Sequence, residues 1–126
     1  MPSEYAAAAA FRAELRRFLR RSEECARNHG LTPQQHMLLL MIAGSDGATS
    51  TVSELVERLQ LTQSAVTELV QRAEEAHFVT RRPSPSDRRV VELRLTGDGA
   101  RRLAGVHAEL GPERHQLKAI VDRLTD

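Results

Sequence analysis

Four arginines lie close together near residue 85 and are the side chains best placed to bind an anion. Arg81, Arg82, Arg88 and Arg89 flank a turn built from two Pro-Ser pairs. A guanidinium group stays charged and donates hydrogen bonds in a fork that matches a phosphate. Residues 80–91 set these four arginines against one aspartate, Asp87, whereas the net charge of the whole chain is only +1. This local charge predicts contact with the phosphates of a nucleic acid.

The segment that holds the arginines is predicted to be a β-hairpin. After the turn, Val91, Leu93 and Leu95 alternate with polar residues, which is the period of a strand with one buried face. A hairpin with a cationic tip is poorly suited to a protein core. It is well suited to probing a groove lined by phosphates.

Two short helices are predicted immediately before the hairpin. Thr51 and Glu54 have the spacing of a capping box at the start of the first helix. Thr62 is expected to cap the second helix, which extends from Gln63 to about Ala76. About three residues separate the two helices, as a helix-turn-helix requires.

The second of these helices has one apolar face and one face rich in hydrogen-bonding groups. Its inner face consists of Val66, Leu69, Val70 and Ala73. Its outer face consists of Gln63, Ser64, Thr67, Glu68, Gln71 and Arg72. These outer side chains can pair with the donors and acceptors on base edges. The alternative is the ordinary solvent-exposed face of an amphipathic helix, and periodicity alone does not separate the two interpretations.

A further helix is predicted before this pair. Gly30 ends the preceding helix, Thr32 has the place of an N-cap, and Pro33 occupies the first helical position. Gln35 completes a capping box with Thr32. Residues 37–42 are apolar nearly all round, so we expect this helix to be buried.

Both ends of the chain are predicted to be helical and to carry apolar stripes in need of a partner. Residues 4–28 read as one long helix with a stripe close to a coiled-coil seam. The stripe consists of Phe11, Leu15, Phe18, Ser22 and Cys25. After the hairpin, Thr96 is expected to cap a helix, and Gly111-Pro112 separates it from a last helix ending near Leu124. We expect the two ends to pack together as a dimerisation lobe.

Length and composition indicate a single folded unit. The chain has 126 residues, of which 40% are hydrophobic, and it lacks the apolar run of about 20 residues that a membrane span needs. Ala6–Ala10 is too short for a signal peptide and charged residues follow it at once, so we expect a cytoplasmic, nucleoid-associated protein. The predicted fold class is mainly α with a small β-hairpin wing (α+β).

The cysteine and the histidines give little indication of a disulfide, a redox site or a metal site. Cys25 is the one cysteine, which excludes an intrachain disulfide. It is interpreted first as a small buried hydrophobe, and the alternative is a redox switch near Arg27 or His29. The spacings of the histidines match no zinc pattern, so no metal and no cofactor are predicted. The histidines are His29, His36, His77, His107 and His115.

The central part of the chain resembles the MarR family of winged-helix transcriptional regulators. The resemblance covers roughly residues 31–103 and includes the runs LTPQQHMLLLMIAG and TVSELVERLQLTQSAVTELVQRAEEAHFVTR. The most specific element is Asp87-Arg88-Arg89, followed by a strand and the run Leu95-Thr96-Gly97-Asp98-Gly99. Residues 1–126 then form one subunit, with a winged helix-turn-helix lobe at 31–96 and a helical dimerisation lobe at 4–29 and 97–126.

The resemblance implies a homodimer that binds double-stranded DNA at a pseudo-palindromic operator. The helix from Gln63 to Ala76 would enter the major groove, and Arg89 would lie in or beside the minor groove. Asp87 and Arg81 would buttress the wing. Many members of the family repress genes, and others sense oxidants through a cysteine.

The family also implies release of DNA by a small phenolic or anionic ligand bound between the lobes. The corresponding region is where the second helix meets the first and the fifth. Arg12, Phe18, His29 and His36 are the residues expected to line it. For Phe18, packing is the alternative role.

Two departures from the family pattern stand out. Glu68 occupies a position where members often have a basic or amide residue. A carboxylate there weakens the attraction to phosphates, although it can accept a hydrogen bond from cytosine N4. Before the wing, the family's glycine is replaced by His77, which is expected to take a strained left-handed backbone unless the turn differs.

Two other functions compete with DNA binding. Glu68 and the low net charge favour a protein-interaction module that kept the winged helix and lost DNA binding. An enzyme is disfavoured because the chain has no nucleophile elbow and no metal-ligand spacing. Gly97 and Gly99 open a helix but lack the loop and lysine of a phosphate site.

Overall fold

The structure, a computed structural model, describes the backbone of residues 2–125 and the side chains of residues 3–123. It confirms a mainly helical chain with one β-hairpin. The elements are α1 (Pro2–Asn28), α2 (Pro33–Ala43), the 3₁₀ turn η1 (Asp46–Ala48), α3 (Val52–Leu59), α4 (Gln63–Glu75), β1 (Val79–Pro83), β2 (Val91–Leu95), α5 (Gly97–Glu109) and α6 (Gly111–Thr125).

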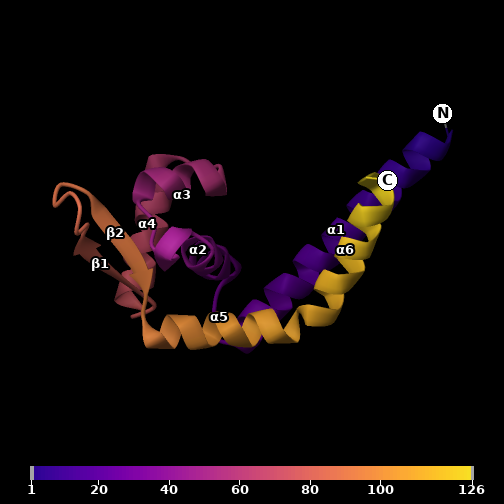
Figure 1. Cartoon of the computed structure of the whole chain (residues 1–126). Helices are drawn as coiled ribbons and strands as arrows, with labels where there is room; N and C mark the ends of the chain where they lie inside the picture. The colour runs from indigo at the N-terminus through magenta and orange to yellow at the C-terminus, as the bar shows by residue number, and fades with distance from the viewer. Residues whose placement is uncertain (1, 126) are drawn as a thin grey trace.

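The elements form a compact lobe and a long arm (Figure 1). Helices α2, α3 and α4 and the hairpin make the lobe, and α5 passes along its base. Helix α6 lies against α1, and the two extend away from the lobe with both termini at the far end. The hairpin projects at the opposite end of the molecule, so the cationic tip is far from the arm.

Threonine side chains cap α2, α4 and α5 at the predicted positions. Thr32 and Gln35 form the complete capping box, with bonds of 3.1 Å from Gln35 N to Thr32 Oγ1 and 3.0 Å from Thr32 N to Gln35 Oε1. Thr62 Oγ1 accepts from Ala65 N at 3.2 Å, and Thr96 Oγ1 accepts from Gly99 N at 3.0 Å. Each cap satisfies an amide that the first helical turn leaves without a partner.

The predicted capping box between Thr51 and Glu54 forms only one of its two hydrogen bonds. Thr51 Oγ1 accepts from Glu54 N at 3.2 Å, as predicted. The Glu54 carboxylate accepts instead from Ser50 Oγ at 3.3 Å. Ser50 is buried beside the sheet. Its hydroxyl takes the place of the Thr51 amide, which was the predicted donor to Glu54.

The hairpin is antiparallel and is extended by one bridge to the segment before α3. Val79 pairs with Leu95, and Arg81 pairs with Leu93. On the other edge of β2, Ser50 N donates to Leu93 O at 3.1 Å and Leu93 N donates to Ser50 O at 2.7 Å. Leu93 is therefore held on both sides and is fully buried, which fixes the base of the wing to the helices.

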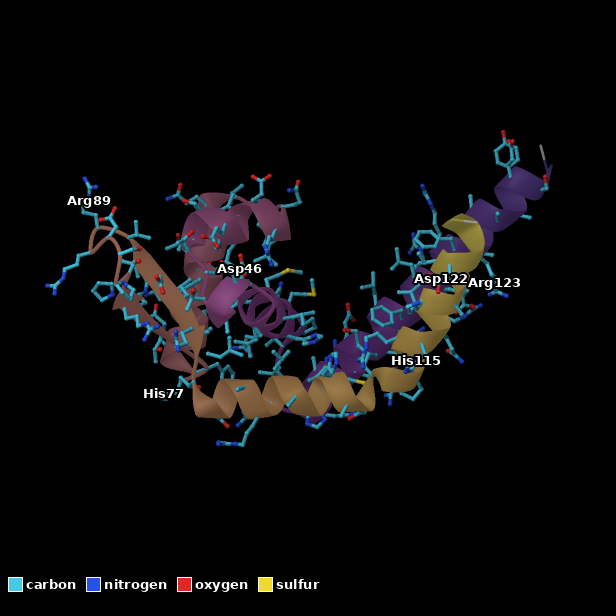
Figure 2. All side chains as sticks on the ribbon, in the orientation of Figure 1. Asp46, His77, Arg89, His115, Asp122 and Arg123 are labelled. Carbon is cyan, nitrogen blue, oxygen red and sulfur yellow. The ribbon has the colours of Figure 1, made fainter. Side chains whose placement is uncertain are left out.

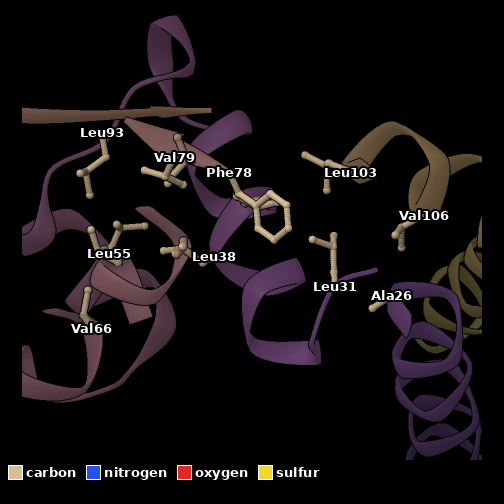
Figure 3. Packing of buried hydrophobic residues seen from close by; sticks show 14 of the residues in the cluster. Ala26, Leu31, Leu38, Leu55, Val66, Phe78, Val79, Leu93, Leu103 and Val106 are labelled. Carbon is tan, nitrogen blue, oxygen red and sulfur yellow. The ribbon is translucent and has the colours of Figure 1, made fainter. Parts of the chain in front are cut away.

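One hydrophobic cluster holds the lobe and the root of the arm together (Figure 3). Leu38, Leu55, Val66 and Leu93 are fully buried in the part of the cluster that lies inside the lobe. The cluster continues through Phe78 and Leu31 to Ala26 of α1 and to Leu103 and Val106 of α5. Each fully buried aliphatic side chain contributes about 1.5–3 kcal/mol to the stability of the fold. Because the cluster is continuous, the lobe and the root of the arm form one packed body.

The prediction that α2 is buried holds for only part of its surface. Leu38, Leu39 and Ile42 are fully buried, but Met37 and Leu40 are each 38% exposed. Helix α2 packs against α1 and α5 on one side and against α3, α4 and β2 on another. Met37 and Leu40 lie one turn apart on the face that these elements leave open.

The arm buries less apolar surface than the lobe. The stripe of α1 is half-buried at Phe11, Leu15 and Phe18, and it becomes fully buried only at Cys25. Leu117 and Ile120 of α6 are also half-buried, and the side chain of Leu124 lies outside the described residues. None of the helices in the described part of the chain is both long and apolar enough to cross a membrane.

Candidate nucleic-acid interface

Helix α4 presents the predicted hydrogen-bonding face to solvent. Its inner side chains, Val66, Val70 and Ala73, are fully buried, which fixes the rotation of the helix. The structure brings five of the six predicted outer residues around one shallow hollow. These residues are Gln63, Ser64, Thr67, Glu68 and Gln71. The sixth, Arg72, lies beside them and donates from Nη2 to Glu68 Oε1 at 2.6 Å.

The tip of the wing is ordered by its own polar groups. Ser84 N donates to Val90 O at 2.8 Å, which closes the turn. The Asp87 carboxylate accepts from Arg89 Nε at 3.2 Å and from Arg89 N at 3.1 Å. These bonds from the Arg89 side chain, and then from its backbone, lower the pKa of the Asp87 carboxyl group. The Arg89 side chain is 91% exposed and points away from the body of the protein (Figure 2).

The basic side chains of this surface divide into paired and unpaired groups. Arg81 Nε donates to Glu74 Oε1 at 2.6 Å, which ties β1 to the end of α4. Arg72 and Arg89 are paired with Glu68 and Asp87. Among the side chains of residues 3–123, none forms an ion pair with Arg82 or Arg88, and both are exposed. Exposed ion pairs contribute little, so a phosphate can replace a carboxylate at the paired positions.

In the turn between α4 and β1, His77 takes the left-handed backbone that we expected where it replaces the family's glycine. His77 has a φ of 63°, which confirms the expectation, and lies at the base of the hairpin (Figure 2). Its neighbours hold this conformation in place. Its carbonyl accepts from Thr96 Oγ1 at 2.7 Å, and its amide donates to Glu74 O at 3.0 Å.

The start of α5 is in tight contact with the first residues after α4. Thr96 N donates to Phe78 O at 2.9 Å. A Cβ atom added at Gly99 would lie 2.3 Å from the same carbonyl oxygen. Glycine is the residue that permits this close approach of α5 to the Phe78 carbonyl.

The sequence model of the MarR family matches residues 29–90. The chain resembles this family over that segment, which is just under half of its length. The HTH-type transcriptional repressor MdtR of Bacillus subtilis is 34% identical over 76 residues, which cover 60% of this chain and 48% of MdtR. This chain therefore spans about half the length of the curated relative it matches.

Solved structures share the fold over nearly the whole chain. AbsC of Streptomyces coelicolor, a MarR family transcriptional regulator, gives a TM-score of 0.77 at 22% identity and covers 99% of this chain and 86% of AbsC. A mutant of MarR from E. coli, complexed with operator DNA, gives a TM-score of 0.67 at 22% identity. That comparison covers 94% of this chain and 93% of the E. coli protein.

The four residues predicted to line a ligand pocket do not gather at one place. Arg12 is exposed on the arm, and Phe18 lines a depression between α1 and α6 together with Arg21. His29 Nε2 lies 3.1 Å from Glu109 Oε1. A separation of 17 positions puts Arg12 about 25 Å along the helix from His29, because an α-helix rises 1.5 Å per residue.

His36 is the one of the four that is buried. Its Nδ1 lies 3.5 Å from Ser22 Oγ, at the contact between α2 and α1. Burial lowers the pKa of His36, and the charge of His107 lowers it further. At this contact the histidine is therefore neutral near pH 7, and it joins the lobe to the arm.

The end of α1 is clasped by α5. Arg102 Nη1 donates to His29 O at 3.0 Å, and its guanidinium carbon lies 5.1 Å from the centre of the Phe78 ring. A Cβ atom at Gly105 would lie 2.4 Å from His29 Nδ1, so the imidazole lies directly on α5. Sequence reasoning missed Arg102 and Gly105, because their contacts with His29 and Phe78 span more than twenty residues of sequence.

Cys25 has the surroundings of a structural residue. Its side chain is fully buried, and burial raises the pKa of the thiol to about 11. Redox-active cysteines have a lowered pKa and are accessible, so these surroundings favour the buried-hydrophobe interpretation. Among the side chains of residues 3–123, no group of three or more His, Cys, Asp or Glu is arranged to hold a metal ion.

Proposed function

We propose that this protein is a transcriptional repressor that binds operator DNA as a homodimer. The observation that carries the proposal is the placement of two DNA-facing elements on one lobe. The polar face of α4 and the arginine-tipped wing are both exposed and both fixed to the same core. A helix in the major groove and a hairpin on the flanking backbone need this arrangement.

The relatives support this proposal. MdtR is named a transcriptional repressor, and the E. coli MarR structure contains operator DNA. In this chain α4 would enter the major groove with Gln63, Ser64, Thr67 and Gln71 near the bases. Arg82 and Arg88 would meet phosphates directly, and Arg81 and Arg89 would exchange a carboxylate for a phosphate.

The arm is proposed to form the dimer. Tyr5 is 74% exposed and Leu19 is 48% exposed on α1, and Val121 is 37% exposed on α6. A second copy would cover these side chains by a twofold contact between arms. The two α4 helices would then face successive major grooves, about 34 Å apart along the duplex.

The test is binding to duplexes from the promoter of its own gene, measured by fluorescence anisotropy from 50 to 200 mM salt. We expect a sequence-selective complex of two subunits whose affinity falls steeply with salt. A reporter gene under that promoter should be more active when the protein is absent. No selective binding at low salt, or a monomer at micromolar concentration, would contradict the proposal.

A small phenolic or anionic effector is proposed to act at the contact of α1, α2 and α5. The support is that polar groups join the lobe to the arm at this contact, among them Ser22, His36 and Arg102. An effector that prefers a different angle there would misplace the α4 helices. Titrating salicylate into the DNA complex tests this, and release of DNA is the expected result.

A protein-interaction module is the second candidate. It is favoured by the carboxylates that pair with three of the basic side chains, Glu68, Glu74 and Asp87. A stable complex with another protein, together with no DNA binding at low salt, would establish it.

A further inference from the structure

The middle of the exposed face of α4 carries an ion pair where a polyanion would bind. Glu68 and Arg72 lie one helical turn apart, with Glu68 Oε1 2.6 Å from Arg72 Nη2. Their side chains are 62% and 69% exposed, so the surrounding residues do not hold them in place. Exposed pairs at this spacing add little to helix stability, so rearranging the pair costs little.

Glu68 restricts what this face can contact in a major groove. An ionised carboxylate only accepts hydrogen bonds, so phosphates repel it and base acceptors cannot pair with it. The donors that bases offer in the major groove are the amino groups of cytosine (N4) and adenine (N6). A groove position that satisfies Glu68 must therefore present one of these two groups.

Arg72 favours the amino group of cytosine over that of adenine as the partner of Glu68. Its guanidinium only donates, and its best major-groove partner is the adjacent acceptor pair O6 and N7 of guanine. A G·C pair presents these two acceptors side by side, next to the N4 donor of cytosine. An A·T pair alternates acceptor, donor and acceptor, so a donor fork beside Glu68 would meet only one acceptor.

We propose that Glu68 and Arg72 act as one reading unit that selects a G·C base pair in each half-site. The inference rests on the proposed function and adds the identity of a base pair to it. On DNA, Arg72 donates to guanine O6 and N7 while Glu68 accepts from cytosine N4. The bond between the two side chains holds the acceptor and the donors next to each other before DNA arrives.

The competing explanation is that Glu68 only neutralises Arg72 and repels the duplex. In that case, removing the carboxylate strengthens binding to every sequence by the same factor. The two explanations differ in base preference, which affinity for a single duplex does not reveal.

The experiment first selects the preferred duplex of the wild-type protein from a randomised pool. Anisotropy then measures Kd for that duplex and for versions with each G·C pair of a half-site changed to A·T. We expect one G·C position where the wild type prefers G·C on the order of 10-fold. Glu68→Gln should lose that preference or reverse it toward A·T, because a glutamine amide pairs with adenine N6 and N7.

Glu75→Gln is the matched control. Glu75 lies on the same helix, two turns farther toward its C-terminus, is exposed, and loses the same charge on substitution. It should keep the wild-type preference at every position. Circular dichroism confirms that both variants fold, which we expect because both positions are exposed.

The outcomes separate the inference from the proposed function. A selective wild type whose Glu68→Gln variant keeps every base preference, even with tighter overall binding, overturns the reading unit alone. A wild type that selects no sequence overturns the proposed function and the reading unit with it.

Discussion

Replacing Gly99 by alanine should force helix α5 away from the hairpin. The new Cβ atom would lie 2.3 Å from the carbonyl oxygen of Phe78 and 3.1 Å from its carbonyl carbon. These are backbone atoms, so a change of rotamer cannot relieve the clash. The two elements must separate by roughly 1 Å to reach ordinary van der Waals contact.

The cost can be estimated from the contacts at this point. Overpacking of this kind costs about 1–3 kcal/mol. The separation also strains the 2.9 Å hydrogen bond from Thr96 N to Phe78 O, for which a loss of about 1 kcal/mol is typical. We therefore expect Gly99→Ala to lower the free energy of unfolding by about 3 kcal/mol. For a chain of this size, Tm should fall by roughly 12 °C.

The assay is thermal and urea denaturation followed by circular dichroism, at one fixed protein concentration because a dimer would make Tm depend on concentration. Gly97→Ala is the matched control in the same helical turn. Its Cβ atom would lie 3.7 Å from Arg101 Nη1, an ordinary contact, so its Tm should stay the same or rise slightly. Equal Tm values for the two variants would refute the steric argument.

Three other predictions follow from the charges and the buried groups. Arg82→Ala and Arg88→Ala should each reduce the slope of log K against log salt by about 1. The control Arg101→Ala, on α5, should leave the slope unchanged. If all three variants have the slope of the wild type, the wing is not part of the interface. Because burial lowers the pKa of His36 below its ordinary 6.5, the unfolded chain binds more protons, so stability is full above pH 6.5 and falls as the pH drops. His36→Asn should flatten this fall between pH 7.5 and 5.5 in urea denaturation, and a control at the exposed His115 should not. Cys25 should react with iodoacetamide at pH 7 only after unfolding, because it is buried with a pKa of about 11; rapid labelling of the native protein would contradict its burial.

Much of the fold follows from signals that act over a few residues. Thr32, Thr62 and Thr96 cap helices where the sequence predicted caps, because a cap needs only a hydroxyl and an amide three residues later. The arginine tip is equally local. Its turn and its alternating strand are read within about fifteen residues.

The errors and omissions share a different cause. Exposure of Met37 and Leu40 depends on which faces of α2 the other elements cover, and the apolar run itself does not say this. The bridge from Ser50 to Leu93 joins segments more than forty residues apart, so no short pattern announces it. Ser50 also supplies the hydroxyl that donates to Glu54 in place of the Thr51 amide of the predicted capping box.

The candidate site shows the same division. By itself the sequence determined which side chains line the exposed face of α4 and which arginines stand on the wing, because helical and strand periodicity assign residues to faces. Only the tertiary structure decided that Arg81 meets Glu74, that Arg82 and Arg88 form no ion pair with another described side chain, and that the four expected ligand residues lie apart. Those facts depend on distances between elements, which are set by how the core packs around Leu38, Leu55 and Leu93.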